Sequence, residues 1–323
     1  MKNAQSIFRF LIEAEGRGER TALVTITGVI GRSSRAPGTH MAVSETGAFH
    51  GWLSGGCVEA AVVGEAIRIV GAGKAELLRF GEGSPFIDIR LPCGGGLDLL
   101  IVPRPAPAVV RAAEQRLRMR AQATLAIGLD GGMALDPHDR ETSGWQEDIF
   151  FAAHRPDLRV FVVGHGAEVG ALARIAAAYG ADVQVLTPER DIVDSMAAQG
   201  IAAHWLKTPA ASPHLAADRD SAIVLLFHDH DWEAELLLQA IGQDAFFVGA
   251  MGSRATHAAR LDALRARGVE EAVLRRIRGP VGLIPATRDP DTLALSVLGQ
   301  VVALREAGGQ ALRDVVAAAA NVA

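Results

Sequence analysis

The sequence predicts an α/β protein: an N-terminal mixed α+β domain followed by a C-terminal Rossmann-like domain with a doubly wound parallel sheet. Three observations predict this class. Short strands alternate with glycine turns in the first half, continuous apolar strands alternate with helices in the second, and a polar stretch with prolines separates the two. The 323 residues suffice for two domains with separate cores. We expect one domain at 1–156, with a linker at its C-terminal end, and another at 157–323.

The composition argues against two classes of partner. Hydrophobic residues make up 49% of the chain and the formal net charge is −5, so no large basic face is expected and nucleic acid is not an expected partner. No apolar run reaches the length of a membrane span, and charges interrupt the apolar stretch at residues 7–15, so we expect neither a membrane protein nor a signal peptide. Two cysteines without an export signal indicate a reducing compartment, which predicts a cytoplasmic protein.

The first half opens with an amphipathic helix at residues 7–15 and a strand rich in β-branched residues at 21–30. Residues 41–44 and 48–53 flank Glu45-Thr46-Gly47, a pattern typical of a hairpin. The other elements expected in this half are a helix at 58–70, hairpin strands at 86–91 and 97–102, a helix at 109–119, a hairpin at 124–135 and a linker around 137–156.

A polar loop at residues 31–41 follows the first strand. It places Arg32, Ser34 and Arg35 around a Pro-Gly turn. Forked guanidinium donors and hydroxyls on a tight turn are the groups that grip phosphate in proteins. The alternative is an ordinary solvated turn, which the loop alone would favour. The glycine-rich turns that follow in the sequence favour an anion site instead.

Each of the two cysteines lies in a glycine-rich turn. The turns contain Gly55, Gly56 and Cys57 in the first case, and Cys93, Gly94 and Gly95 in the second. A thiol beside exposed backbone N–H groups suits an anion with a soft centre. The alternative is that both cysteines are small buried hydrophobes in ordinary turns. Finding both cysteines in matching turns favours the functional interpretation.

The first cysteine turn leads into the expected helix at 58–70, with Ser54 near the expected N-cap. Cys57 would then lie at the first turn of the helix, where the positive end of the helix dipole stabilises a thiolate and free amides can hold phosphate. Cys93 would lie at a strand end.

The second half begins with a strand at 158–163, a glycine turn, a helix at 171–179 and a strand at 182–187, which is the context of a dinucleotide fingerprint. The turn contains Gly164 and Gly166, but its spacing is G-x-G-x-x-x-G, one residue too long. No acidic residue after the second strand is squarely placed for a ribose. We therefore expect a Rossmann-type fold and do not favour NAD(P) as its ligand.

Two further strands end in polar residues, where ligand sites of such sheets lie. The strand at 221–227 is followed by His228-Asp229-His230-Asp231, which we interpret as helix capping by an aspartate rather than as a metal site. The strand at 245–250 is followed by Gly252, Ser253 and Arg254 at the start of a helix, a turn that resembles an anion cradle. A final helix starts at 290.

Several of these motifs together resemble the bacterial xanthine dehydrogenase accessory protein family (XdhC/CoxI-like). The resemblance rests on residues 32–38, 54–59 and 92–96 in the first half and on 248–254 and 279–283 in the second. It implies a chaperone that binds molybdenum cofactor (molybdopterin), protects it, supports its sulfuration and inserts it into xanthine dehydrogenase or a related molybdenum hydroxylase. It also implies a sulfur donor of the cysteine desulfurase type as a partner, and a homodimer.

The motifs and the resemblance lead to one hypothesis about the site. Arg32, Ser34 and Arg35 would hold the anionic end of the cofactor together with the Gly55 and Gly56 amides, and Cys57 or Cys93 would contact molybdenum or carry the sulfur. The remaining candidate cofactor-binding residues are Gly94, Gly95, Gly164, Gly166, Gly252, Ser253 and Arg254.

Two rival hypotheses come from other classes of protein. One is an NAD(P)-dependent oxidoreductase that uses the second domain, although the chain offers no evident Tyr/Lys or His/Asp catalytic pair. The other is a redox-sensing binding protein in which Cys57 and Cys93 form a reversible disulfide. The sequence favours a chaperone over an enzyme.

Overall fold

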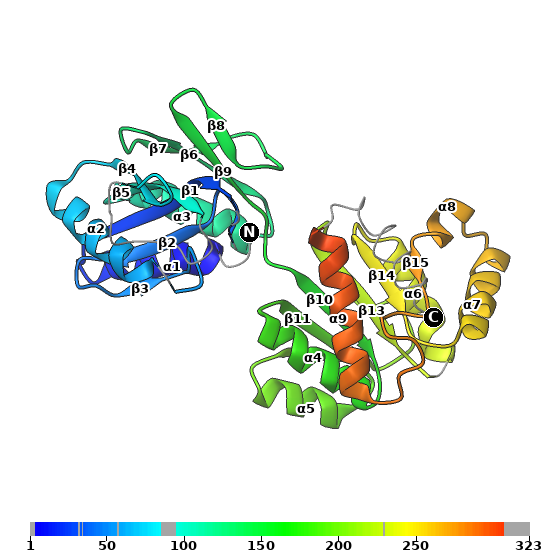
Figure 1. The fold of residues 1–323 in the computed structure, drawn as a ribbon. Coiled ribbons are helices and arrows are strands. Elements are labelled where there is room, and N and C mark those ends of the chain that lie inside the picture. Colours follow the sequence, from blue (N-terminus) through cyan, green and yellow to red (C-terminus); the bar gives the residue numbers. More distant parts are fainter. Residues whose placement is uncertain are drawn as a thin grey trace. The chain divides into compact units, whose positions relative to one another are not determined.

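The computed structural model describes residues 4–306 except Arg32, Ser34, Cys57, residues 85–94 and Asp229, and the side chains of His230 and Asp231. The chain divides into two compact units, Met1–Asp157 and Leu158–Ala323. The first unit combines antiparallel sheets with helices, and the second has a parallel sheet between helices (Figure 1). The predicted fold class is confirmed.

The first unit contains a five-stranded antiparallel sheet, sheet A, in the order β3-β2-β1-β5-β4. Its strands are β1 (Thr21–Ile30), β2 (His40–Ser44), β3 (Phe49–His50), β4 (Glu76–Gly81) and β5 (Gly96–Pro103). The predicted hairpin around residues 45–47 is present as β2 and β3. The strand β5 pairs with β1 and with β4, and β4 is a strand that the sequence analysis missed. The strand expected at 86–91 lies outside the described residues.

Sheet A buries both faces. On one face, α2 (Glu59–Ala72) packs against β1, β2, β4 and β5. On the other face lie α1 (Ala4–Gly16) and α3 (Pro107–Arg118), whose apolar sides share a core with a second, four-stranded sheet. Each helix therefore presents its apolar stripe to a sheet, as amphipathic spacing predicts.

The second sheet of this unit, sheet B, corrects one expectation. Its order is β7-β6-β9-β8. The strands are β6 (Ala123–Gly128), β7 (Met133–Asp136), β8 (Gly144–Gln146) and β9 (Ile149–His154). The linker expected around 137–156 is therefore wrong, because β9 pairs with β6 and buries Phe150 and Ala152 in the core. Flanking charges and prolines concealed the apolar alternation of this strand.

The second unit has one six-stranded sheet, all of whose pairings are parallel, in the order β12-β11-β10-β13-β14-β15. The strands are β10 (Arg159–Gly164), β11 (Asp182–Thr187), β12 (Ala202–Trp205), β13 (Ser221–Leu226), β14 (Phe247–Ala250) and β15 (Ile277–Arg278). This order starts in the middle and winds outward in both directions, which defines the doubly wound Rossmann arrangement.

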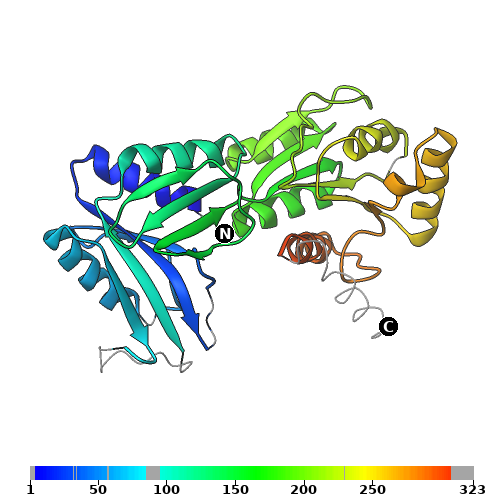
Figure 2. The same cartoon turned by 90° about the horizontal axis from the view of Figure 1, so that it is seen from above.

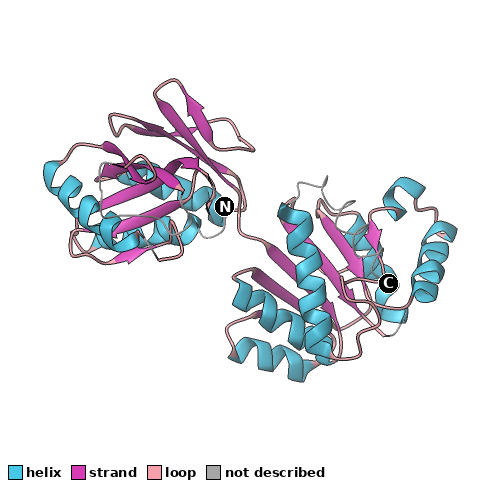
Figure 3. Ribbon diagram, in the orientation of Figure 1, coloured by secondary structure: helices cyan, strands magenta, loops and turns pink. Residues whose placement is uncertain are grey.

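Helices cover both faces of this sheet (Figure 3). They are α4 (Ala167–Tyr179), α5 (Arg190–Ala198), α6 (His230–Ile241), α7 (Arg254–Ala266), α8 (Glu271–Leu274) and α9 (Pro290–Glu306). One core contains buried residues of α4, α5 and α9, and the other contains residues of α6, α7 and α8. None of the described helices, in either unit, is long and apolar enough to cross a membrane.

Candidate functional site

The predicted phosphate loop and second cysteine turn leave sheet A at the same end. Ile30, the last residue of β1, pairs with Gly96, the first residue of β5, and Gly96 also pairs with Gly81 at the end of β4. Figure 2 shows these strands ending together. The loop that follows β1 and the loop that precedes β5 therefore start side by side.

The first cysteine turn is directed toward that same end. The C-terminal half of α2 lies at the opposite end of sheet A, because Arg68 forms an ion pair with Glu76 at the start of β4 (2.7 Å) and Ile67 lies beside the turn between β2 and β3. The N-terminal turn of α2 therefore points toward the loops after β1 and before β5. The described residues beside the three motifs, Gly31, Val58 and Gly95, therefore lie at one end of the sheet.

Part of the predicted site lies outside the described residues: Arg32, Ser34, Cys57, Cys93 and Gly94. The other predicted residues of this unit are described. Arg35, Gly55 and Gly56 are exposed, and the Gly56 N–H donates to Ser54 Oγ (3.2 Å). The Gly95 carbonyl accepts from Glu82 N (3.0 Å) and closes the hairpin of β4 and β5.

Glu59 organises the turn before α2, and sequence reasoning missed it. The helix begins at Glu59 with Val58 as its N-cap, so the expected N-cap at Ser54 is wrong. The buried Glu59 carboxylate accepts from Ser54 N (2.7 Å), Ser54 Oγ (2.8 Å) and Val58 N (3.2 Å). Burial opposes its charge, but these hydrogen bonds outweigh burial and lower the pKa of Glu59. Glu59 thus takes the amides of Ser54 and Val58, and Ser54 Oγ takes that of Gly56, one of the two amides that the sequence analysis assigned to the cofactor.

In the second unit, the glycine turn after β10 departs from the dinucleotide pattern in its packing. A Cβ at Gly164 would lie 2.4 Å from the Leu226 carbonyl oxygen, so this first glycine is required for close approach to β13. The position three after Gly166 holds Val169, fully buried, where the fingerprint has a glycine that lets helix and strand approach. A Cβ at Gly170 would meet only the end of the Arg174 side chain.

Two carboxylates lie at this glycine turn. Glu189, two residues after β11, accepts from Gly166 N through Oε2 (3.0 Å). Glu168 lies in the first turn of α4. Glu189 is 23 residues after Gly166, close to the spacing of a ribose-binding acid, although the sequence analysis judged no acidic residue squarely placed there. Negative charge on both sides of the turn opposes a bound pyrophosphate.

A large cavity of the second unit lies beyond the ends of β13 and β14, with a volume of about 1090 Å³. It is lined by Glu168, Phe227, His228, Met251, Gly252, Ser253, Arg254, Thr256, residues 280–290, Leu293 and Gln300. The predicted Gly252, Ser253 and Arg254 are therefore part of it, whereas Gly164 and Gly166 are not. Its volume suits a ligand the size of a cofactor.

A buried ion pair holds one wall of the cavity. The Arg260 guanidinium donates to both Glu233 carboxylate oxygens (2.9 and 2.8 Å), and its Nη2 also donates to the Met251 carbonyl (2.7 Å). The two side chains are only 3% and 4% exposed. The ion pair therefore fixes the turn in which Met251 precedes Gly252. Ser253 Oγ accepts from Thr256 N (3.0 Å) and caps α7.

The opposite wall is a loop fixed to α9 by buried polar side chains. Gln300 Oε1 accepts from Gly282 N (2.8 Å), and Ser296 Oγ accepts from Ile284 N (2.7 Å). A Cβ at Gly282, whose φ is +111°, would lie 2.7 Å from Ser296 Oγ. The loop therefore has a defined conformation over the cavity.

His228 lines the cavity, whereas Asp229 and the side chains of His230 and Asp231, with the predicted helix capping by an aspartate, lie outside the described residues. His228 Nε2 lies 3.7 Å from Glu168 Oε1. Within the residues that the structure describes, no three His, Cys, Asp or Glu side chains are grouped as a metal site would require.

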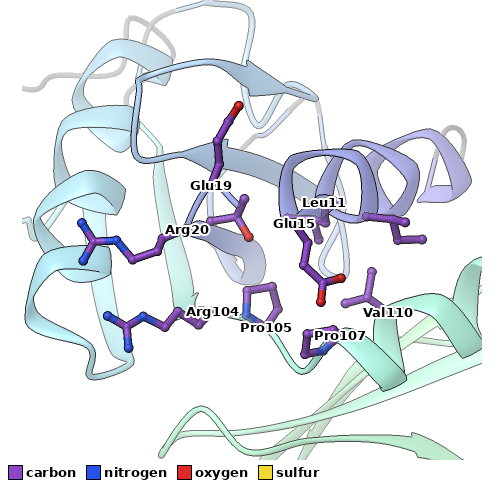
Figure 4. A pocket seen from close by; sticks show the side chains of 10 residues that line it. Leu11, Glu15, Glu19, Arg20, Arg104, Pro105, Pro107 and Val110 are labelled. Atoms are coloured by element: carbon purple, nitrogen blue, oxygen red, sulfur yellow. The ribbon is translucent and has the colours of Figure 1, made fainter. Parts of the chain in front are cut away.

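A second pocket lies in the first unit, between α1 and the start of α3. Leu11 and Val110 line its apolar side, and Arg20 and Arg104 extend side by side at its edge (Figure 4). Its volume is about 180 Å³. That volume is below the range of cofactor sites, so this pocket is not a candidate for a large ligand.

Comparison with known proteins identifies the family. The family model described as XdhC Rossmann domain matches residues 160–301, and the model described as XdhC and CoxI family matches residues 14–81. The chain belongs to the XdhC and CoxI family. The resemblance stated from the sequence is thereby confirmed.

This XdhC and CoxI family member is 37% identical to the molybdenum cofactor insertion chaperone PaoD of Escherichia coli strain K12. The alignment spans 309 residues and covers 93% of this chain and 88% of PaoD. It is 26% identical over 190 residues to the uncharacterised protein YqeB of the same organism, covering 58% of this chain and 32% of YqeB. A crystal structure from Bacillus halodurans, described as a xanthine dehydrogenase, matches with a TM-score of 0.77 and 19% identity over 94% of this chain and 97% of that one. At that identity the match establishes the fold alone.

Proposed function

We propose that this protein carries molybdenum cofactor and inserts it into a molybdenum enzyme. The observation that carries the proposal is the 37% identity to PaoD, named a molybdenum cofactor insertion chaperone, over nearly the full length of both chains. In this proposal the cofactor is cargo, bound and released intact, and the chain itself catalyses no reaction.

The chemistry of the described residues supports such cargo. Molybdenum cofactor is a phosphate-bearing pterin whose dithiolene holds the metal, so a carrier needs a phosphate grip, polar groups for the pterin and a soft donor near the metal. The converging loops of sheet A include Arg35 and the exposed Gly55–Gly56 turn, and the cavity of the second unit includes Arg254. Both regions offer donors to an anion.

The finer proposal concerns sulfur and partners. Cys57 or Cys93 contacts molybdenum or carries the sulfur that a cysteine desulfurase-type donor supplies. The client is xanthine dehydrogenase or a related molybdenum hydroxylase, and the carrier acts in the cytoplasm as a homodimer. Double replacement Cys57→Ser and Cys93→Ser then lowers cofactor retention or sulfuration without unfolding the chain. Unchanged retention and sulfuration in the double variant would remove the thiol role.

The decisive experiment is metal and pterin analysis of the protein purified from cells that make molybdenum cofactor. The proposal expects molybdenum and oxidised-pterin fluorescence at about one equivalent per chain. Absence of both from freshly purified protein would contradict it. Sedimentation analysis of the same sample tests the homodimer.

One observation supports a second candidate function, that of an NAD(P)-dependent oxidoreductase. Glu189 lies close to the position of a ribose-binding acid. The Glu168 and Glu189 carboxylates and the buried Val169 work against a pyrophosphate at the same turn. A thermal-shift titration with NADPH separates the candidates, since stabilisation by NADPH in protein free of molybdenum and pterin would favour the oxidoreductase.

A further inference from the structure

The cavity of the second unit contains a hydrogen-bond donor, on a largely buried side chain, that has no partner among the described residues. Gln300, on α9, lines the cavity and is 7% exposed. Its Oε1 is committed to Gly282 N, which fixes the orientation of the amide because only the oxygen can accept. The two N–H groups of Nε2 have no partner among the residues that the structure describes. The amide is held in place by Gly282 and its free donor is accessible from the cavity, so it suits a ligand that brings an acceptor.

Two cations line the same cavity without partners. Neither Arg254, at the start of α7, nor Arg288, in the loop before α9, makes a hydrogen bond or ion pair with a described residue. The two carboxylates of the cavity, in contrast, contact other side chains or the backbone. Asp289 accepts from Thr292 N (2.7 Å) and Thr292 Oγ1 (2.6 Å), and Glu168 lies beside His228. Glu168 and Asp289 equal the two arginines in number, but the N–H donors of Arg254 and Arg288 are uncommitted, and such donors suit a phosphate.

Much of the rest of the lining is apolar and suits the faces of a flat ring. It includes Phe227, Met251, Val281, Leu283, Ile284 and Leu293. A ligand that satisfies all three features has a flat fused ring, a ring carbonyl for the Gln300 amide and a phosphate for the arginines.

We propose that this cavity binds a phosphorylated fused-ring heterocycle, with a ring carbonyl at Gln300 Nε2 and the phosphate at Arg254 and Arg288. The inference rests on the proposed function and deepens it, because it assigns the phosphate-bearing pterin of the cargo to the second unit. Guanine nucleotides share this chemistry, since guanine and pterin carry the same amino-oxo ring edge.

The test is calorimetric titration of the full chain with a pterin monophosphate, the unphosphorylated pterin, GMP, AMP and inorganic phosphate. The pterin monophosphate should bind at least about tenfold more tightly than the unphosphorylated pterin, as expected for one lost charge-assisted contact. AMP, which lacks the ring carbonyl, should bind about tenfold more weakly than GMP. Equal binding of inorganic phosphate and pterin monophosphate would overturn the cavity assignment. Tighter binding of GMP than of pterin monophosphate would overturn the assignment of the cavity to a pterin.

Matched variants separate the contacts. Gln300→Glu keeps an acceptor for Gly282 N but replaces the free donor, so it should weaken pterin monophosphate and unphosphorylated pterin alike, by about tenfold. Arg254→Ala and Arg288→Ala should each weaken only the phosphorylated ligand by a similar factor. Arg265→Ala is the control, because Arg265 on α7 pairs with Asp262 and Glu271 and does not line the cavity. Unchanged affinity in all three cavity variants would overturn the proposal.

Cargo analysis distinguishes this failure from failure of the proposed function. If wild-type protein retains molybdenum and pterin and the three cavity variants retain them equally, the carrier function stands and the cavity assignment fails. If wild-type protein retains neither, the carrier function fails, and the titrations still decide whether the cavity binds the heterocycle.

Discussion

The imidazoles of His40 and His154 meet Nε2 to Nε2 at 3.0 Å inside the first unit. His40 lies on β2 of sheet A and His154 at the end of β9 of sheet B, and both are buried against Phe8 of α1. His40 Nδ1 also contacts Thr25 Oγ1 (2.9 Å), whereas His154 Nδ1 has no partner among the described residues. The protonation that leaves no buried N–H unpaired has His154 donating through Nε2 to His40, and His40 donating through Nδ1 to Thr25.

This pair predicts that the first unit loses stability in mild acid. Burial lowers the pKa of His40 from 6.5 to about 3, and burial together with His40 also lowers the pKa of His154. The unfolded chain therefore binds more protons below pH 6.5, and folding free energy is lost as the pH falls toward 3. Each histidine contributes a slope of about 1.4 kcal/mol per pH unit in that window.

His154→Gln tests this prediction, because glutamine can donate to His40 Nε2 but does not titrate. Urea unfolding from pH 7 to pH 4 should show a shallower loss of stability in the variant than in wild type. Replacement of the exposed His138 by glutamine is the control. Equal pH slopes in wild type and His154→Gln would contradict the assignment of the acid sensitivity to this pair.

Glu59 should stabilise the turn that carries Cys57. In Glu59→Gln, an amide NH₂ would face backbone N–H groups that now donate to the carboxylate. We therefore expect a loss of about 1–3 kcal/mol in unfolding free energy at pH 7. The pKa of Glu59 is lowered from 4.5, so its contribution is present above pH 4.5 and disappears as the pH falls below it. The difference between variant and wild type should therefore shrink in acid.

Glu65→Gln is the matched control for Glu59. Glu65 lies on the same helix, but its ion pair with Arg68 is on the surface. Its replacement should change the unfolding free energy by less than about 1 kcal/mol. If both variants lost the same amount, the role of Glu59 in the turn would be refuted.

The Arg260–Glu233 pair should hold the cavity wall in place, and breaking it should lower the free energy of unfolding. Glu233→Gln leaves a buried guanidinium without its carboxylate, and we expect about 3–5 kcal/mol of destabilisation in chemical unfolding. Arg260→Met with Glu233→Leu removes both charges, so it should be much closer to wild type in stability. A single variant as stable as wild type would show that the pair is not buried as described.

Gly164 should tolerate no side chain. A Cβ there would lie 2.4 Å from the backbone oxygen of Leu226, so Gly164→Ala should destabilise the second unit by about 1–3 kcal/mol or more. Gly170→Ala is the matched control in the adjoining helix, where only a flexible arginine end is near, and it should be neutral or stabilising by up to about 1 kcal/mol. Thermal unfolding of the two variants makes the comparison, and equal effects would contradict it.

Local patterns determined much of this fold from the sequence. The continuous apolar strand at 221–227, the glycine turn after β10 and the hairpin at residues 124–135 each depend on neighbours close in the chain, so periodicity and turn chemistry reveal them. The same patterns located the turn at Gly252–Arg254, because a site of a doubly wound sheet lies beyond the strand ends. Family membership also follows from motifs visible in the sequence.

Only the tertiary structure decided which distant side chains meet. His40 and His154 are 114 residues apart, and the bond of Gln300 to Gly282 depends on where α9 packs. Glu189 and Ser54 Oγ accept from the Gly166 and Gly56 amides, which local reasoning left for a ligand. These contacts arise when elements pack together, because burial and hydrogen-bond satisfaction act between surfaces that no local pattern brings into view. The sequence therefore determined the elements and the family, and packing decided which polar groups remain available in the cavity.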